Sequence, residues 1–598
     1  MSVKSLEPEA ETARQAREAE QKSVSPGAPA PTWIHRPVLE EWKPAYSPIL
    51  LVLLTLACLL PFIDKAFHID DTLFVMAAKQ IVKHPLDPYG FHVVWVATDR
   101  PMWEVTKNPP LASYYAAVMG TLAGWSERAL HLAFLVPAIV LVLGTYRLAR
   151  RFTRYPLLAA AAALLTPGFI VSATSVMCDT MMLALWVLAA VVWIEGLEPE
   201  RPPFLIVAAL LIAASGLTKY FGAALIPLAF AYALARKRRL GTWALYLLIP
   251  VLALAGYQLW THALYGHGLL LDATQLAGFR DPDEGTSALA RGLIGMGFVG
   301  GCTLTGLTFA PLVWARKHIL IGIAVAALAG LTISRGWINL GAPAAHANWT
   351  FVSGQLACYI AGAISIFALA ISDFRERKDA DSLFLGLWIF GPFVFAAFLN
   401  WTVNARTVLP LIPAAGILLA RRWEKVRPAA RRYRLVKLVA PLALSGLVSL
   451  WIAIADFDLA NSARTAAHLI AQETAGEKTP VLFEGHWGFQ YYMESFGARP
   501  LDFVKPNYQP GQILAIPDNN TLAFWTPPGF TGPAQVIEVN ISRGVTTMKP
   551  QMGAGFYSSM WGPLPFAFGH VPPERYFVVR LTPIRSADQP PPSGNPAP

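Results

Sequence analysis

The chain has 598 residues, of which 55% are hydrophobic and only 14% are charged. Soluble domains contain roughly 45–50% apolar and about 25% charged residues, so this composition excludes an ordinary water-soluble protein. The formal net charge of +10 does not indicate nucleic-acid binding, because the basic residues fall in short runs between apolar stretches, where they set orientation in a membrane.

The first 45 residues are polar, rich in Glu, Ala and Pro, and lack the early apolar core of a cleavable signal peptide. We interpret residues 1–45 as a disordered cytoplasmic tail. All four cysteines lie in or beside apolar segments, so the sequence predicts neither a disulfide framework nor a CxxC metal site.

Apolar stretches of about 20 residues, the length that crosses a hydrocarbon core of roughly 30 Å, recur through the first three quarters of the chain. They predict a mostly α-helical, polytopic bundle over 46–455. Its thirteen predicted spans are 48–63, 129–148, 155–173, 178–196, 203–217, 220–235, 242–261, 291–313, 318–334, 351–371, 382–400, 407–420 and 435–455.

The basic runs predict the orientation of this bundle, because short cytoplasmic loops carry an excess of Lys and Arg. With the N-terminal tail inside, the runs at 147–154, 236–239, 316–317, 375–378 and 421–434 all become cytoplasmic. This requires the apolar piece 109–125, which opens with two prolines, to be a re-entrant or interfacial helix within the first outer loop, 64–128.

The last part of the chain loses the long apolar runs. Short strand-like pieces occur at 479–485, 512–517, 534–542 and 575–581, and a helix is predicted near 462–475. We expect a small extracytoplasmic α/β domain over 456–582, followed by a disordered, Pro-rich tail over 583–598.

Three acidic residues fall at the predicted outer ends of apolar segments. Asp70 and Asp71 open an amphipathic stretch after the first span, and Asp179 opens a strongly apolar helix. A carboxylate at such a place can act as a general base toward an acceptor hydroxyl or amine. The alternative is that these residues cap the helices that follow them, and both roles can hold at once.

Three isolated cations reach the same predicted face: Lys107, Lys219 and Arg406. Each alone is more often a snorkelling interface residue. Together they can bind phosphate, since Lys supplies a point charge and Arg a bidentate fork. The sequence contains no Walker loop, HExxH or GxSxG motif, so an activated substrate must arrive by a route other than soluble ATP, and lipid is the obvious carrier.

In their order and spacing these motifs resemble class C glycosyltransferases of family 39, the group that contains protein O-mannosyltransferases and the aminoarabinose transferase of lipid A. The resemblance covers roughly residues 48–420. It matches the family's motifs to the acidic pair Asp70-Asp71, the proline-marked helix from Lys107 to Leu111, Asp179, the turn Thr218-Lys219 and the segment from Arg406 to Pro413. Two departures are Asn108, which separates Lys107 from the prolines, and Tyr220, which replaces a common glycine.

The resemblance implies transfer of a sugar from a polyprenyl-phosphate donor to a lipid, glycan or protein acceptor on the outer face. Lys107, Lys219 and Arg406 would hold the lipid phosphate, Asp70 would be the base, and Asp71 and Asp179 would orient the acceptor or share that role. Direct attack would invert the anomeric carbon. The Ala, Arg and Pro bias favours a bacterial inner membrane and undecaprenyl phosphate as the carrier.

The family includes metal-free members and members with a divalent cation, and no ligand set in this sequence demands one. In the family the soluble domain caps the cavity. In this chain the predicted domain's motif GHWGFQYYMESFG could face an acceptor or pack the domain, and we favour packing for His486, Trp487, Gln490 and Tyr491.

Two other classes of function remain open. A transporter or flippase for a lipid-linked sugar would also place charges at membrane depth, but it should show internal repeats or matched broken helices, which the sequence lacks. A scaffold that binds partners through its outer domain is the other alternative.

Overall fold

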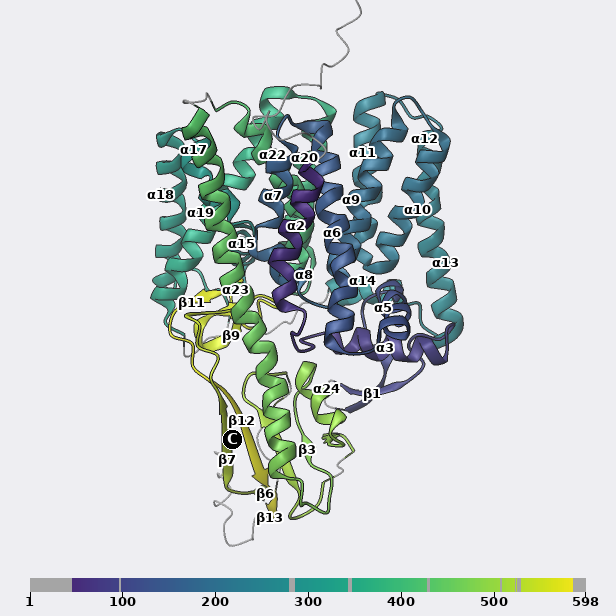
Figure 1. Ribbon diagram of the computed structural model, residues 1–598, viewed down its shortest axis with the longest axis vertical. Helices are drawn as coiled ribbons and strands as arrows, with labels where there is room; N and C mark the ends of the chain where they lie inside the picture. Colours follow the sequence, from purple (N-terminus) through teal and green to yellow (C-terminus); the bar gives the residue numbers. More distant parts are fainter. Residues whose placement is uncertain are drawn as a thin grey trace, which may run out of the picture. The chain divides into compact units, whose positions relative to one another are not determined.

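The computed structural model describes residues 46–583 apart from 96–97, 279–285, 342–346, 427–430, 506–507, 522, 524–526 and 528. The tails predicted over 1–45 and 583–598 therefore lie outside the described residues, except for Pro583. Helices dominate the described part of the chain up to Glu473, and short strands follow it (Figure 1).

Every predicted span has a helical counterpart. The principal helices of the bundle are α2 (Tyr46–Leu59), α6 (Glu127–Phe152), α7 (Pro156–Leu164), α8 (Pro167–Ala173), α9 (Cys178–Leu197), α10 (Pro202–Thr218), α11 (Leu225–Lys237), α13 (Leu248–Tyr265), α15 (Ala288–Cys302), α18 (Arg316–Ser334), α19 (Trp349–Arg377), α20 (Ala380–Val394), α22 (Ile412–Trp423) and α23 (Arg431–Glu473).

Within the described residues, seven helices are long and apolar enough to cross a membrane, or eight if one bent pair is counted as a single span. This is fewer than the thirteen predicted, because several predicted spans consist of shorter helices in series. The span predicted at 407–420, for example, begins as α21 (Ala405–Val408) and a short 3₁₀ turn before α22, in a segment that contains Pro410 and Pro413.

The bent pair is α7 and α8, where the sequence predicts one straight span over 155–173. The two helices meet at an angle of 64°. Pro167 has no N–H to continue the α7 hydrogen-bond ladder, and the Thr166 hydroxyl instead accepts the backbone N–H of Phe169 at 3.3 Å, which starts a new helix. The free carbonyl of Leu165 accepts a hydrogen bond from Ser445 Oγ of α23 at 2.5 Å.

Close helix packing in the bundle depends on small residues, as is usual where helices meet in lipid. A Cβ on Gly300 of α15 would lie 1.7 Å from the Tyr359 carbonyl oxygen of α19. A Cβ on Gly416 of α22 would lie 2.3 Å from the Ala159 oxygen of α7. Glycine at these two places lets the backbones touch, and it fixes the position of α22, which follows the predicted site residue Arg406.

The first predicted outer loop gathers at one end of the bundle (Figure 1). It contains α3 (Asp71–Lys83), the hairpin β1 (His92–Trp95) with β2 (Thr98–Pro101), and α5 (Leu111–Ala123). Helix α5 lies beside α3 at this end and does not cross the bundle, in agreement with the re-entrant or interfacial helix predicted over 109–125 (Figure 1). The basic ends of α11 and α22 lie at the opposite end (Figure 1).

The strand-rich C-terminal region packs at the same end as α3. Its main sheet has the order β4-β3-β5-β12-β7, in which β3 pairs in parallel with β4 and β5 and the remaining pairs are antiparallel. The strands are β3 (Leu482–Phe483), β4 (Arg499–Pro500), β5 (Ile513–Pro517), β7 (Ala534–Val539) and β12 (Glu574–Arg580). All four predicted strand segments contribute to this sheet, whereas β4 was not predicted.

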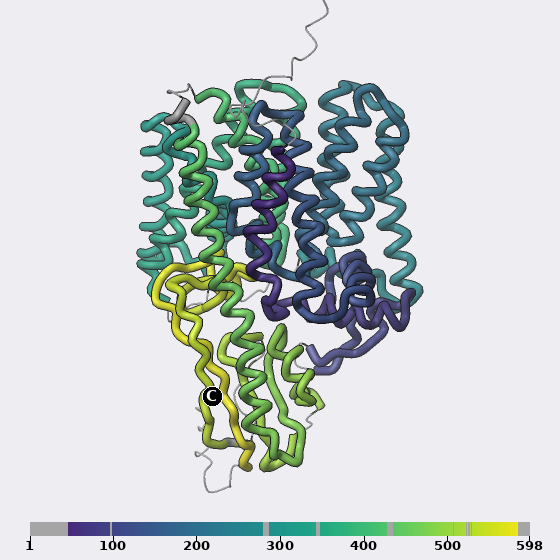
Figure 2. Tube along the Cα trace, in the orientation of Figure 1, coloured from purple at the N-terminus to yellow at the C-terminus, as the bar shows by residue number. Residues whose placement is uncertain are grey.

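Helix α23 connects the two regions. It runs without a break from Arg431 to Glu473, so it includes both the span predicted over 435–455 and most of the helix predicted near 462–475. Figure 2 shows it as a green helix that continues from the bundle to the side of the sheet. A short helix, α24 (Trp487–Ser495), lies between this sheet and α3.

Candidate active site

A cavity of about 940 Å³ opens where α3, the loop before α5, the turn after α10, α20 and α21 meet. Four of the six predicted site residues line it: Asp70, Lys107, Lys219 and Arg406. The deeper wall is apolar and comes from α11 and α20, with Leu228 and Trp388 among its residues. The cavity therefore has charged side chains on one part of its wall and apolar side chains on another.

Asp70 lies at the N-cap position of α3, but its carboxylate does not cap the helix. The side chain is 26% exposed, and Oδ2 accepts a hydrogen bond from Arg406 Nη1 at 2.9 Å. The preceding residue, Ile69, has a φ of 50°. A β-branched residue in this left-handed region costs on the order of 1–3 kcal/mol, so the surrounding contacts must hold the backbone that presents Asp70.

Asp71 is fully buried and does not line the cavity. Its two carboxylate oxygens accept backbone hydrogen bonds from His68 N at 2.9 Å and from Val176 N at 2.8 Å. Burial raises the pKa of Asp71 to about 7, against the opposing effects of Lys65 and these two hydrogen bonds. Asp71 thus ties the start of α3 to the loop that precedes Asp179.

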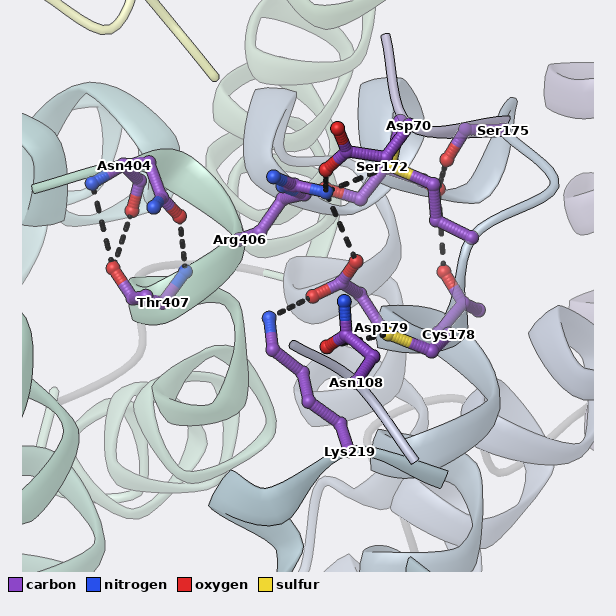
Figure 3. Close-up of polar contacts among 12 residues, drawn as sticks. Asp70, Asn108, Ser172, Ser175, Cys178, Asp179, Lys219, Asn404, Arg406 and Thr407 are labelled. Atoms are coloured by element: carbon purple, nitrogen blue, oxygen red, sulfur yellow. Dashed lines mark hydrogen bonds and ion pairs between the residues drawn. The ribbon is translucent and has the colours of Figure 1, made fainter. Parts of the chain in front are cut away.

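Asp179 lies in the first turn of α9 and is 1% exposed. Its Oδ1 accepts a hydrogen bond from Lys219 Nζ at 2.5 Å, and Arg406 Nη1 lies 3.9 Å from Oδ2. Figure 3 shows the resulting row of charges, in which Arg406 lies between the two carboxylates and Lys219 reaches Asp179 from the other side. Ion pairing, rather than helix capping, accounts for this buried acid.

The turn that carries Lys219 is unusually tight. Lys219 ends α10, and its carbonyl accepts the backbone N–H of Gly222 at 2.8 Å. A Cβ on Gly222 would lie 2.3 Å from the carbonyl carbon of Ser215, so only glycine fits there. The glycine expected directly after the lysine is thus found two positions later, and Tyr220 lines the cavity instead.

Arg406 is held by a short capped helix. Asn404 is the N-cap of α21, and it exchanges hydrogen bonds with Thr407 in a capping box (Figure 3). The guanidinium is 15% exposed and also contacts Met177 Sδ at 2.9 Å. The predicted residue Arg406 therefore reaches both Asp70 and Asp179 from a fixed backbone.

Lys107 lines the same cavity from the loop before α5. It is half-buried, and burial lowers its pKa, with Asp272 and Glu104 acting in the opposite direction. The neighbouring Asn108 is fixed by its carbonyl, which accepts the Tyr89 hydroxyl at 2.8 Å, and its side chain lies 3.6 Å from Cys178 Sγ. Asn108, the residue that separates Lys107 from the two prolines, therefore does not remove Lys107 from the cavity.

The residues around the cavity do not fit a divalent cation. Such an ion needs about six oxygen ligands, whereas Asp70 and Asp179 each face a protein cation. Over the ranges described, no group of three His, Cys, Asp or Glu side chains is placed to hold a metal.

The GHWGFQYYMESFG segment packs against the first outer loop. His486 stacks on Trp95 with ring centroids 4.6 Å apart, and Gln490 Nε2 donates to the Val94 carbonyl at 3.3 Å. Tyr491 meets Phe67 edge to face at 5.1 Å. These contacts agree with the packing interpretation of the segment.

Sequence reasoning did not single out Tyr557, which lines the cavity from the strand-rich region. No local signal marks it, because it approaches Arg406 only through the fold. Sequence reasoning also missed Asp456, which is completely buried and pairs with Lys65 at 2.6 Å. A signal existed there, since Asp456 is an acid at the end of an apolar span, the same feature that drew attention to Asp179.

Comparisons with known proteins bear on the fold. Residues 107–260 match the family model described as dolichyl-phosphate-mannose-protein mannosyltransferase. No curated protein matches the sequence closely enough to count as a relative. A crystal structure of ArnT from Cupriavidus metallidurans bound to undecaprenyl phosphate is 15% identical, covers 80% of this chain and 94% of its own, and has a TM-score of 0.52.

A structure of the Archaeoglobus fulgidus oligosaccharyltransferase tethered to an acceptor peptide is more distant. It is 12% identical, covers 77% of this chain and 64% of its own, and has a TM-score of 0.44. The match to ArnT confirms the mostly helical fold class, and with the family model it confirms the resemblance predicted from the motifs. The chain is therefore a membrane protein with the fold of the class C glycosyltransferases, similar over residues 107–260 to the dolichyl-phosphate-mannose-protein mannosyltransferases.

Proposed function

We propose that this chain transfers a sugar from a polyprenyl-phosphate donor to an acceptor on the extracytoplasmic face of a bacterial inner membrane. One observation carries the proposal: Asp70, Lys107, Lys219 and Arg406 face one cavity whose deeper wall is apolar. An apolar wall suits a prenyl chain, and the cations in the wall suit its phosphate. The ArnT structure that shares this fold contains undecaprenyl phosphate, which favours the same carrier here.

The charge balance of the site suits a phosphodiester. Lys107, Lys219 and Arg406 against Asp70 and Asp179 leave one net positive charge among these five residues. The donor phosphodiester carries one negative charge, and the departing polyprenyl phosphate carries a second. Lys219 and Arg406, which already lie beside Asp179, can stabilise that developing charge.

Asp70 is the proposed general base. The acceptor oxygen or nitrogen attacks the anomeric carbon, the bond from that carbon to the phosphate oxygen breaks, and the Asp70 carboxylate takes the acceptor's proton. Arg406 is shared between Asp70 and the phosphate, so donor binding draws the guanidinium away and leaves the carboxylate available. A single displacement of this kind inverts the anomeric carbon. Asp71 positions the loop before Asp179, and Asp179 positions Lys219 and Arg406.

The test compares purified wild-type protein with Asp70→Asn in detergent. A radiolabelled polyprenyl-phosphate sugar and a membrane extract are added, and both donor binding and label transfer are measured. Loss of a general base should lower kcat by about 10²–10⁴-fold while donor binding persists. Asp64→Asn is the matched control, because Asp64 lies in the same loop, is 47% exposed and pairs with Arg128. Donor that binds but is never consumed, across sugars and extracts, would instead support a transporter.

A further inference from the structure

The strand-rich region sends one turn into the bundle beside Arg406. The backbone N–H of Ala405 donates to the Phe556 carbonyl at 2.8 Å, and Ser559 N donates to the Val403 carbonyl at 2.7 Å. Ser559 Oγ also accepts the Val403 N–H at 3.1 Å. The turn 556–559 is therefore bonded to the backbone that leads directly into Arg406.

Tyr557 is the side chain of this turn that enters the cavity wall. Its ring centroid lies 6.0 Å from the Arg406 guanidinium carbon, within reach of a cation–π interaction, and the ring meets His68 edge to face at 5.3 Å. Its hydroxyl donates to Asp456 Oδ2 at 2.9 Å. Tyr557 thus touches one residue of the phosphate-binding group and one residue of the segment that carries Asp70.

Asp456 fixes Tyr557 from behind. It is fully buried, and its carboxylate also accepts Lys65 Nζ at 2.6 Å and Thr547 Oγ1 at 2.6 Å. Three chain segments therefore meet on one carboxylate: the end of the first span, α23 and the strand-rich region. A carboxylate with this many charge-assisted partners holds each of them in a defined place.

Helices α23 and α24 also hold the backbone before Asp70. Ala66 N donates to Asn461 Oδ1 at 2.9 Å, and Phe67 N donates to the Tyr492 hydroxyl at 2.9 Å. A Cβ on Gly488 would lie 2.1 Å from the Phe67 carbonyl oxygen, so α24 presses directly on this segment. These contacts supply the restraint that the left-handed backbone at Ile69 requires.

We infer that Tyr557 is a positioning residue of the transferase site, which tethers Arg406 to Asp456 and aligns it with the Asp70 segment. The strand-rich region then helps to form the phosphate-binding site, in addition to packing over that end of the bundle. This inference rests on the proposed function, because Arg406 is taken to bind the donor phosphate.

Binding of undecaprenyl phosphate to the full-length protein in detergent tests the inference without requiring the sugar to be known. Tyr557→Leu removes both the ring beside Arg406 and the hydroxyl that bonds Asp456. We expect it to weaken undecaprenyl phosphate binding by about tenfold, because a displacement of the Arg406 guanidinium by about an ångström would weaken its contact with the phosphate. Tyr557→Phe keeps the ring over Arg406 and should recover much of the loss. In an Arg406→Gln background, Tyr557→Leu should weaken binding no further, because residues that act through one another are not additive.

Tyr576→Phe is the matched control. Tyr576 is buried in the same region, and its hydroxyl bonds Ser462 Oγ at 2.9 Å, but it does not line the cavity. It should lower thermal stability about as much as Tyr557→Phe and leave binding unchanged. Wild-type affinity in folded Tyr557→Leu, or a full additional loss in the Arg406→Gln background, would overturn the inference alone. A wild-type protein that binds no undecaprenyl phosphate would overturn the proposed function and the inference with it.

Discussion

Asp70 and Asp71 are neighbours in the chain with opposite surroundings. Asp70 is partly exposed in the cavity and faces Arg406, whereas Asp71 is fully buried and accepts two backbone N–H groups. Asp70 is the N-cap of α3 and Asp71 its first residue, so the two side chains leave the backbone in different directions. Of the two, only Asp70 therefore lines the cavity, whereas Asp71 holds the loop before Asp179.

The burial of Asp71 predicts a specific pH dependence of stability. The pKa of Asp71 is raised from the ordinary 3.8 to about 7 in the folded protein. The contribution of its protonated form to the free energy of unfolding is therefore complete below about pH 3.8 and is lost as the pH rises through 7. The full change amounts to about 4 kcal/mol. We expect the difference in thermal unfolding temperature between wild type and Asp71→Asn to shift in favour of the variant across this window.

The measurement is a series of unfolding temperatures in detergent from pH 4 to pH 8. Asn also places an N–H₂ group against one backbone donor, but that cost does not vary with pH and appears as a constant offset. Taking the difference between the two proteins removes the titration of every other group. A difference that stays flat from pH 4 to pH 8 would show that Asp71 is not the group that titrates.

The candidate site could be predicted from the sequence only as far as its residues share local signals. Asp179, Lys219 and Arg406 are isolated charges at the ends of apolar segments, and Asp70 belongs to an acidic pair at such an end, a costly placement that marks them. The burial of Asp71 and the partial exposure of Asp70 could not be predicted, because they depend on contacts with distant chain segments at Val176 and Arg406. Tyr557 could not be predicted either, because distant chain segments bring it to Arg406.

At the level of elements, the bend between α7 and α8 shows what hydropathy alone leaves out. The stretch 155–173 is uniformly apolar and long enough for one span, yet it forms two helices at 64°. A broken helix at this depth exposes backbone groups that lipid cannot satisfy, so a partner from the protein is required. Ser445 of α23 supplies it, with its Oγ 2.5 Å from the Leu165 oxygen. The Ser449 hydroxyl lies 3.4 Å from the same oxygen but donates to the Ser445 carbonyl of its own helix at 2.7 Å.

We therefore expect Ser445→Ala to destabilise the protein by about 1 kcal/mol, because it removes the nearest hydroxyl donor of a buried carbonyl. Ser449→Ala should cost less, because the Ser449 hydroxyl bonds mainly within its own helix. Thermal unfolding in detergent measures both. Thr145→Ala is the matched control, since Thr145 is equally buried but its hydroxyl bonds the Leu141 oxygen within its own helix at 2.8 Å. A loss in the control as large as that in Ser445→Ala would count against a special role for the bend.

At the level of the whole molecule, charge separates the two ends of the bundle. The basic ends of α6, α11, α19 and α22 share one end, as the predicted orientation requires (Figure 1). The cavity, α3 and the strand-rich region share the other. Short basic loops are usually retained in the cytoplasm, so from this asymmetry we predict that the end of the bundle with the cavity faces outward.

This orientation predicts which surfaces a membrane-impermeant thiol reagent can reach in intact cells. Gly476 lies beyond α23 with open space around it, so Gly476→Cys should be labelled from outside. Lys317 is exposed at the basic end, so Lys317→Cys should be labelled only after the membrane is permeabilised. Cys358→Ser provides the background, because Cys358 is exposed and the other three cysteines are buried. Labelling of Lys317→Cys in intact cells, with Gly476→Cys protected, would reverse the orientation and place the acceptor in the cytoplasm.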